Sequence, residues 1–96
     1  MMYEIITTRQ FMRRAKKFLH KHPDLRGRLA GLIDDLRDDP FQPHIRLHAL
    51  GGKLEGIFAA SISHSYRLTL TLEITEKEII LLDVCSHDEV YRKRRL

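Results

Sequence analysis

Cysteine is scarce in this chain of 96 residues, which has Cys85 as its single example. One cysteine excludes a framework of internal disulfides and a zinc site built from several cysteines. Long apolar runs are also missing, and none approaches the ~20 residues that a membrane-spanning helix needs. The first ten residues lack the apolar core of a signal peptide, so we expect a cytoplasmic protein without a membrane partner. Because domains rarely have fewer than ~50 residues, we expect a single domain over residues 1–96.

Basic residues outnumber acidic ones. The sequence has 17 Lys and Arg against 13 Asp and Glu, and it also has six His. The basic side chains gather in the C-terminal run Arg92–Arg95 and on one face of a predicted first helix: Arg9, Arg13, Arg14, Lys16, Lys17 and Lys21. A basic surplus favours a polyanion such as RNA as the partner. For the helix face, a merely solvated surface is the alternative interpretation.

Two helices are predicted between residues 7 and 39. Thr7 and Gln10 have the spacing of a capping box, so the first helix is expected to begin there. Its apolar stripe is Phe11, Ala15, Phe18 and Leu19. His22-Pro23 ends it, because the residue before a proline avoids the α region. The second helix has the stripe Leu25, Leu29, Leu32, Ile33 and Leu36 and ends at Asp39-Pro40. The short break between them predicts an antiparallel helical hairpin.

The remaining pattern predicts strands and one short helix. A strand is expected at residues 2–7, and three more at residues 54–61, 66–72 and 78–84, the last of them central in the sheet. Residues 41–52 are expected to form an extended loop. Ser86 and Glu89 have capping-box spacing, so a final helix should begin near His87. The order β-α-α-β-β-β-α predicts an α+β fold, with a small antiparallel sheet and the helical hairpin packed on it.

Several side chains suit acid–base chemistry on RNA without a metal ion. RNA can be cut by its own 2′-hydroxyl if the protein supplies a base, an acid and cations for the phosphate oxygens. The candidates are His48, Lys53, His64, Arg67, His87 and Tyr91. His87 and Tyr91 are four residues apart on one helix, so their side chains can meet. The spacing of the histidines matches no metal-binding motif, and we expect neither a metal nor a cofactor.

Two blocks of the sequence resemble a known family. The segment Leu47–Leu68, LHALGGKLEGIFAASISHSYRL, is similar to the L-x-G-x-(L/Y)-x-G…YR(L/V) block of the RelE/ParE superfamily of toxins. The segment LLDVCSHDEVY with its basic tail is similar to the C-terminal block of the same superfamily. The resemblance covers most of the chain and is densest from Leu47 to Tyr91. It implies the RelE-like fold and, for the RelE and YafQ branches, a ribosome-dependent mRNA endonuclease.

The resemblance also implies roles for single residues. Arg67 stands at the arginine that contacts the scissile phosphate, and Tyr91 at the aromatic that orients the cut nucleotide or acts in acid–base chemistry. His87 corresponds to a C-terminal histidine, which serves as the general acid or a phosphate contact, and His48 to the candidate base. Further contacts to RNA phosphates are expected from Lys53, His64, Arg92 and Arg94. The sequence departs from the YafQ pattern at two positions, where Ser61 replaces a histidine and Ser65 an aspartate.

The implied partners are the ribosome with its mRNA, and a cognate antitoxin encoded beside the toxin. The antitoxin is expected to offer an acidic or amphipathic segment that orders on binding. Two alternatives remain open. ParE-type relatives share the fold but inhibit DNA gyrase without cutting nucleic acid, and an inactive homologue would only bind an antitoxin.

Overall fold

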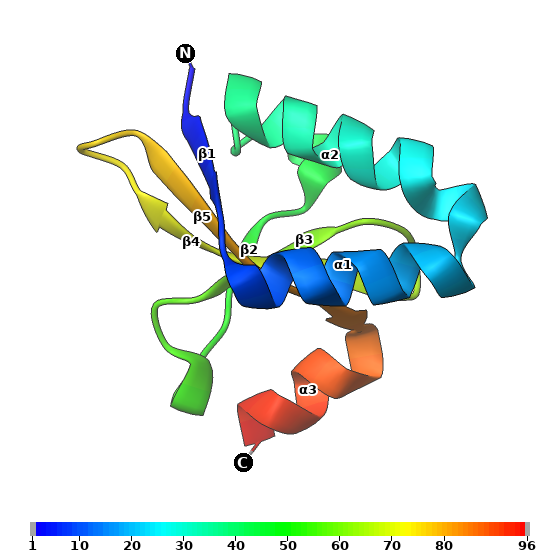
Figure 1. Cartoon of the computed structure of the whole chain (residues 1–96). Coiled ribbons are helices and arrows are strands. Elements are labelled where there is room, and N and C mark those ends of the chain that lie inside the picture. The colour runs from blue at the N-terminus through cyan, green and yellow to red at the C-terminus, as the bar shows by residue number, and fades with distance from the viewer. Residues whose placement is uncertain (1, 96) are drawn as a thin grey trace.

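The computed structural model in Figure 1 describes the chain path of residues 2–95 and the side chains of residues 2–92. Three turns of 3-10 helix, η1 to η3, lie at Pro23–Leu25, Pro43–Ile45 and Gly52–Leu54. The helices are α1 (Arg9–Lys21), α2 (Arg26–Asp38) and α3 (His87–Arg95). The strands are β1 (Glu4–Thr7), β2 (His48–Ala49), β3 (Phe58–Ser61), β4 (Tyr66–Glu73) and β5 (Glu78–Ser86). The expected α+β class is confirmed, with one short strand added at β2.

The sheet has the order β1-β5-β4-β3-β2. β5 has a neighbour on each side, as its nearly continuous apolar sequence predicted. The expected antiparallel arrangement holds from β5 to β2, but β1 runs parallel to β5 with Glu4 opposite Glu78. The sheet is therefore mixed. The connection from β1 passes through α1 and α2, which leaves β1 beside the last strand.

Apolar side chains cover both faces of this sheet. On one face, α1 and α2 lie side by side as the predicted hairpin and bury their apolar stripes (Figure 1). The core they share with the sheet includes Phe11, Phe18, Leu29, Leu32, Leu36, Leu68, Leu70 and Val84. On the other face, Val90 of α3 packs with Leu50, Ala59 and Cys85. Cys85 is thus a small core residue, and α3 is held against the end of the sheet.

The helix starts depend on local capping. Ser86 and Glu89 form the predicted capping box: the Ser86 hydroxyl accepts from the Glu89 N–H at 3.1 Å, and the Glu89 carboxylate accepts from the Ser86 N–H at 3.1 Å. The prediction of a cap at Thr7 was wrong by one residue. Thr8 is the N-cap, and its hydroxyl accepts from the Phe11 N–H at 3.0 Å. Thr7 continues β1 instead, where it is paired with Leu81.

The region before β3 differs from the expected long strand at residues 54–61. Gly52 and Gly56 have φ values of 61° and 89°, which favour glycine and interrupt an extended chain. η3 and a tight turn, with Ile57 N–H donating to the Leu54 carbonyl at 3.0 Å, occupy this region. β3 therefore begins only at Phe58. Among the described residues, no helix combines the length and apolar character needed to cross a membrane.

Candidate RNA-cleavage site

A pocket of about 270 Å³ lies where the β3–β4 hairpin meets the start of α3. Its lining consists of His64, Ser65, Tyr66, Arg67, Ser86, His87 and Asp88. The His87 N–H donates a 2.8 Å hydrogen bond to the Ser65 carbonyl, which fixes the first residue of α3 to the hairpin. Three of the predicted site residues, His64, Arg67 and His87, are therefore gathered at one place. The strand register brings them together, because Tyr66 pairs with Ser86 at the adjoining ends of β4 and β5.

Arg67 is held firmly by the hairpin that carries it. Its Nη1 donates to the carbonyls of Ser63, His64 and Tyr66 at 2.7, 3.1 and 3.0 Å. These carbonyls orient a half-buried guanidinium group without neutralising it. Because guanidinium presents five N–H donors in a rigid fork, nitrogens other than Nη1 can still face a phosphate.

A second pocket of about 280 Å³ lies on the other side of Arg67, between the hairpin and α2. Arg67 and His64 line both pockets, and this one adds Arg28, His44 and Arg46. His44 is exposed and is paired with Asp35 at 2.7 Å. The two arginines were not singled out in the sequence, since they are distant in the chain from the hairpin.

His87 and Tyr91 stack on the exposed side of α3, as their spacing predicted. Their ring centroids are 6.3 Å apart with 25° between the planes. Tyr91 is 48% exposed, and the capping box fixes the turn that carries His87. This pair can meet a substrate that approaches from solvent.

The other predicted residues are not brought into this pocket. His48 lies in β2 on the same sheet face as Arg67, but the register places β3 between them and their backbones ~12 Å apart. Its Nδ1 is 3.1 Å from the Arg46 carbonyl. Lys53 is exposed in η3, and Arg92 is exposed on α3. The side chain of Arg94 lies outside the described residues.

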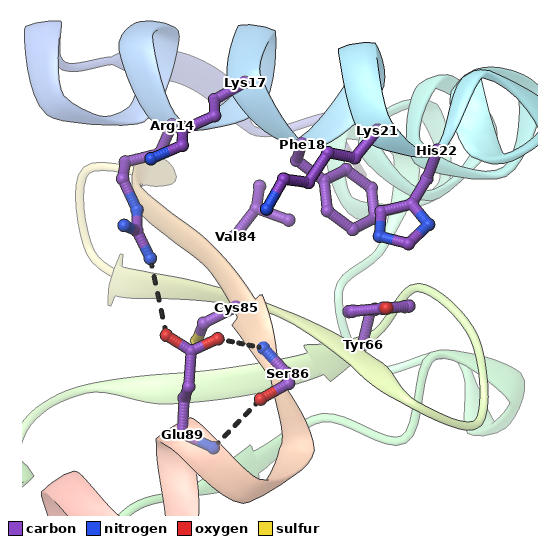
Figure 2. Close-up of a pocket in the computed structure, with 10 residues that line it drawn as sticks. All are labelled: Arg14, Lys17, Phe18, Lys21, His22, Tyr66, Val84, Cys85, Ser86 and Glu89. Atoms are coloured by element: carbon purple, nitrogen blue, oxygen red, sulfur yellow. Dashed lines mark hydrogen bonds and ion pairs between the residues drawn. The ribbon is translucent and has the colours of Figure 1, made fainter.

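A cleft of about 390 Å³ opens between α1 and the ends of β4 and β5, and Figure 2 shows its lining. Lys17, Lys21 and His22 line it from α1, and Tyr66 and Ser86 line both this cleft and the pocket of Arg67. His22 and Tyr66 have ring centroids 4.7 Å apart, so His22 both ends α1 and forms part of the aromatic wall of this cleft. Its spacing of four residues from Phe18 was a readable signal, because such pairs meet on a helix.

Arg14 closes one end of this α1 cleft. Its Nε donates to Asp83 Oδ1 at 2.8 Å, and its Nη2 is 3.7 Å from Glu89 Oε2. The hydrogen bond to Asp83 raises the pKa of Arg14 above its ordinary value, and the attraction of Asp83 and Glu89 adds to this effect. Arg14 thus contacts two carboxylates with its single charge and links α1 to Glu89 of the α3 capping box.

An apolar groove runs between α1 and α2 on the side away from the sheet and has a volume of about 730 Å³. Its floor includes Phe11, Ala15, Leu19, Leu29, Ala30 and Ile33. Arg13, Lys16 and Arg26 form a basic rim. A groove of this kind can accept an amphipathic helix whose polar side is acidic.

The chemistry available at the pocket of Arg67 is acid–base catalysis with stabilisation of phosphate charge. Imidazole side chains can transfer protons, and a guanidinium can neutralise phosphate oxygens. Among the described residues, no three His, Cys, Asp or Glu side chains converge as metal ligands would. The arrangement can therefore bind a phosphate group and transfer a proton beside it.

Solved structures that share this fold include several toxins. No family model matches the chain, and neither does any curated protein. YafQ of Escherichia coli, also solved in the DinJ–YafQ toxin–antitoxin complex, has a TM-score of 0.77 and 19% identity over 93% of this chain and 98% of its own. A copper-bound mutant toxin of Helicobacter pylori has a TM-score of 0.74 and 27% identity over 92% and 98%. A chain of the Mycobacterium tuberculosis toxin–antitoxin complex RelBE2 has a TM-score of 0.63 and 24% identity. The match covers 91% of this chain and 100% of that chain.

Proposed function

The chain has the fold of the RelE/YafQ-like toxin superfamily, and from this premise we propose that it is the toxin of a type II toxin–antitoxin pair. As such it cleaves mRNA on the ribosome and thereby stops translation. The observation that carries this proposal is the pocket lined by both Arg67 of the β3–β4 hairpin and His87 at the start of α3. A ribosome-bound substrate suits so open a pocket, because the ribosome positions the RNA and the protein need not enclose it.

In the proposed reaction, the 2′-oxygen of the RNA attacks the adjacent phosphorus atom and the bond to the 5′-oxygen breaks. A 2′,3′-cyclic phosphate forms, and water then opens it to a 3′-phosphate. Arg67 stabilises the charge that develops on the phosphate oxygens. His87 donates a proton to the leaving 5′-oxygen, and Tyr91 orients the cut nucleotide through its stacking with His87.

A base must also remove the proton from the 2′-hydroxyl, and His48 is our candidate. It shares the sheet face of Arg67, and both side chains can extend toward one nucleotide across β3. His64 faces the phosphate from the hairpin, and Lys53, Arg92 and Arg94 contact RNA farther from the bond that is cut. Neither a metal ion nor a cofactor enters this scheme.

The proposed partner is an antitoxin that binds the apolar groove between α1 and α2. Two of the similar structures are toxin–antitoxin complexes. The basic rim of Arg13, Lys16 and Arg26 favours an amphipathic antitoxin helix with acidic flanks. This groove lies across α1 from the α1 cleft and shares no lining residue with the pocket of Arg67, so the antitoxin and the RNA bind at different places.

The test is cleavage of mRNA on purified ribosomes with an empty A site. We expect the wild-type protein to cut the mRNA, and His87→Ala to cut it about 10²–10⁴ times more slowly. His20→Ala is the matched control, since it removes an exposed histidine of α1 that lines none of these cavities. If the wild type leaves mRNA intact, or if His87→Ala with Tyr91→Phe cuts at the wild-type rate, the proposal is wrong.

The alternatives have their own readouts. Inhibition of DNA gyrase in a supercoiling assay, without RNA cleavage, would favour a ParE-like inhibitor. Overexpression that leaves growth unchanged would favour an inactive homologue that only binds its antitoxin.

A further inference from the structure

The α1 cleft shown in Figure 2 has chemistry that the reaction described above does not use. It is a separate cavity of about 390 Å³, and it meets the pocket of Arg67 at Tyr66 and Ser86, which line both. A chain that passes over Tyr66 from one cavity therefore enters the other. A linear polymer could therefore occupy both cavities, with Tyr66 between two of its units, and be cut in the pocket of Arg67.

Lysine side chains give this cleft a net positive charge. Lys17 and Lys21 are four residues apart and extend from the same side of α1 toward the cleft (Figure 2). Among the side chains described, neither forms an ion pair, whereas Arg14 is bound to Asp83 and Glu89. Arg14 offsets one of these two carboxylates, so the three cations Arg14, Lys17 and Lys21 exceed the carboxylates by one charge. The two lysines are the cations available for an anion. They can neutralise one phosphate together, or two successive ones.

Aromatic rings form the wall beside these lysines. Phe18 and His22 contact Tyr66 with ring centroids 5.0 Å and 4.7 Å away, and the Phe18 contact is edge-on at 72°. Phe18 is buried in the core, so the group is anchored. Tyr66 is only half-buried and presents a fixed ring to the cleft. Base stacking on such a ring is tolerant of sequence, because every base has a π-face.

From these observations, and resting on the proposed function, we propose that the α1 cleft is a second RNA subsite. It holds the nucleotide next to the one that is cut, with its base against Tyr66 and His22 and its phosphate between Lys17 and Lys21. Tyr66 then separates the two nucleotides and sets the register of the RNA relative to Arg67. The basic face of α1 is thereby divided, since Arg13 and Lys16 line the apolar groove instead.

The first experiment measures RNA binding without cleavage. A fluorescent single-stranded RNA pentamer with 2′-O-methyl groups cannot be cut, and fluorescence anisotropy gives its affinity for the full chain. We expect Lys17→Ala with Lys21→Ala to weaken binding about tenfold at low salt and to reduce the logarithmic salt slope by about 0.7, since the two lysines share one phosphate and each phosphate contact contributes ~0.7 on single strands. Tyr66→Leu should weaken binding about tenfold, whereas Tyr66→Phe, which keeps the ring, should bind almost as the wild type does.

The matched control removes the same charge from the other side of the helix. Arg13→Ala with Lys16→Ala should change affinity less than about threefold, because these residues face the groove. Circular dichroism confirms that both double variants are folded. Equal losses in the two double variants would mean a general charge effect and would overturn the proposal, as would a wild-type protein that does not bind the pentamer.

A second experiment separates mRNA from ribosomal RNA as the anion. Binding is measured to ribosomes with a codon in the A site and to ribosomes whose mRNA ends before that site. We expect the Lys17 and Lys21 double variant to lose affinity only for the first. A loss with both kinds of ribosome would assign the lysines to ribosomal RNA, and a loss confined to the antitoxin complex would assign them to that partner. Either result overturns the subsite.

These outcomes are distinct from failure of the proposed function. If the protein binds the pentamer through Lys17 and Lys21 but cuts no mRNA, the RNA subsite is supported and the proposed nuclease activity is refuted. If the protein cuts mRNA equally well with and without the two lysines, the proposed nuclease activity is supported and the subsite is refuted.

Discussion

Arg14 and Asp83 join α1 to β5 through a 2.8 Å hydrogen bond between Nε and Oδ1. Asp83 is buried, with 8% of its side chain exposed, while the Arg14 side chain is 34% exposed. A buried carboxylate that loses its cation keeps the cost of desolvation, so this pair should matter more than an ion pair in solvent.

We therefore expect Arg14→Met to lower the free energy of unfolding by about 1–2 kcal/mol, below the value for a fully buried pair because solvent reaches Arg14. The measurement is urea denaturation followed by circular dichroism. Arg37→Met is the control, because Arg37 also has a 2.8 Å contact, to Asp34, with both side chains largely exposed. That variant should change stability by less than about 0.5 kcal/mol. Equal effects of the two variants would contradict the assignment.

The capping box of α3 should link stability to cleavage. Ser86→Ala removes the acceptor for the Glu89 N–H and should cost about 1 kcal/mol. Since His87 begins the same turn, the rate of mRNA cleavage should fall as well. Ser86→Thr keeps a hydroxyl and should preserve both properties. Ser63→Ala, at the hairpin, removes a hydroxyl that caps no helix and should leave unfolding in urea unchanged; a Ser86→Ala protein as stable as this control would rule out the cap.

Lysine should not replace arginine at position 67. The three hydrogen bonds that Arg67 donates to hairpin carbonyls all use Nη1, which leaves the rest of its fork for a phosphate. A single ammonium group must either hold the hairpin carbonyls or face the phosphate. We expect Arg67→Lys to slow cleavage about 10²-fold, comparable to the loss of one donor to a developing oxyanion. Arg92→Lys, outside the pocket, should retain most of the rate in the same ribosome assay.

The antitoxin groove can be tested with one added charge. Ala30→Glu places a carboxylate in the apolar groove, where an antitoxin helix would bury it, so affinity should fall about tenfold or more. Gly31→Glu adds the same charge one residue later, where a side chain has open space, and should change affinity little. Isothermal titration with the antitoxin gives both values. If the two variants bind alike, the antitoxin lies elsewhere.

Features with short sequence spacing could be predicted from the chain alone. The stripe of Leu29, Leu32 and Leu36 is buried as its period requires, and the box of Ser86 and Glu89 forms as its spacing predicted. The cap at Thr8 rather than Thr7 was not accessible in this way. Either threonine can accept the bond, and the pairing of Thr7 with Leu81 decides between them.

The site was only partly predictable from the sequence, because several of its contacts join segments that are far apart in the chain. Arg67 and His87 were found because each stands in a recognisable motif, and they meet because β4 pairs with β5. The contact of His22 with Tyr66 joins two segments far apart in the chain, so neither residue was marked by its own neighbours. Arg28 and Arg46 were missed because only the tertiary fold brings α2 and the segment after η2 close to the hairpin.

The parallel pairing of β1 with β5 has a consequence for the synthesis of this protein. Glu4–Thr7 is synthesised well before its partner in the sheet, Glu78–Leu81, because both helices of the hairpin and three strands lie between them in the chain. A nascent chain can form the helical hairpin early but cannot complete the sheet until β5 has left the ribosome. Pairings between such distant residues also slow folding, because the loop between them must close first. The site at the adjoining ends of β4 and β5 therefore forms only after β5 has left the ribosome, so a nascent chain that is still short of β5 has no cleavage site.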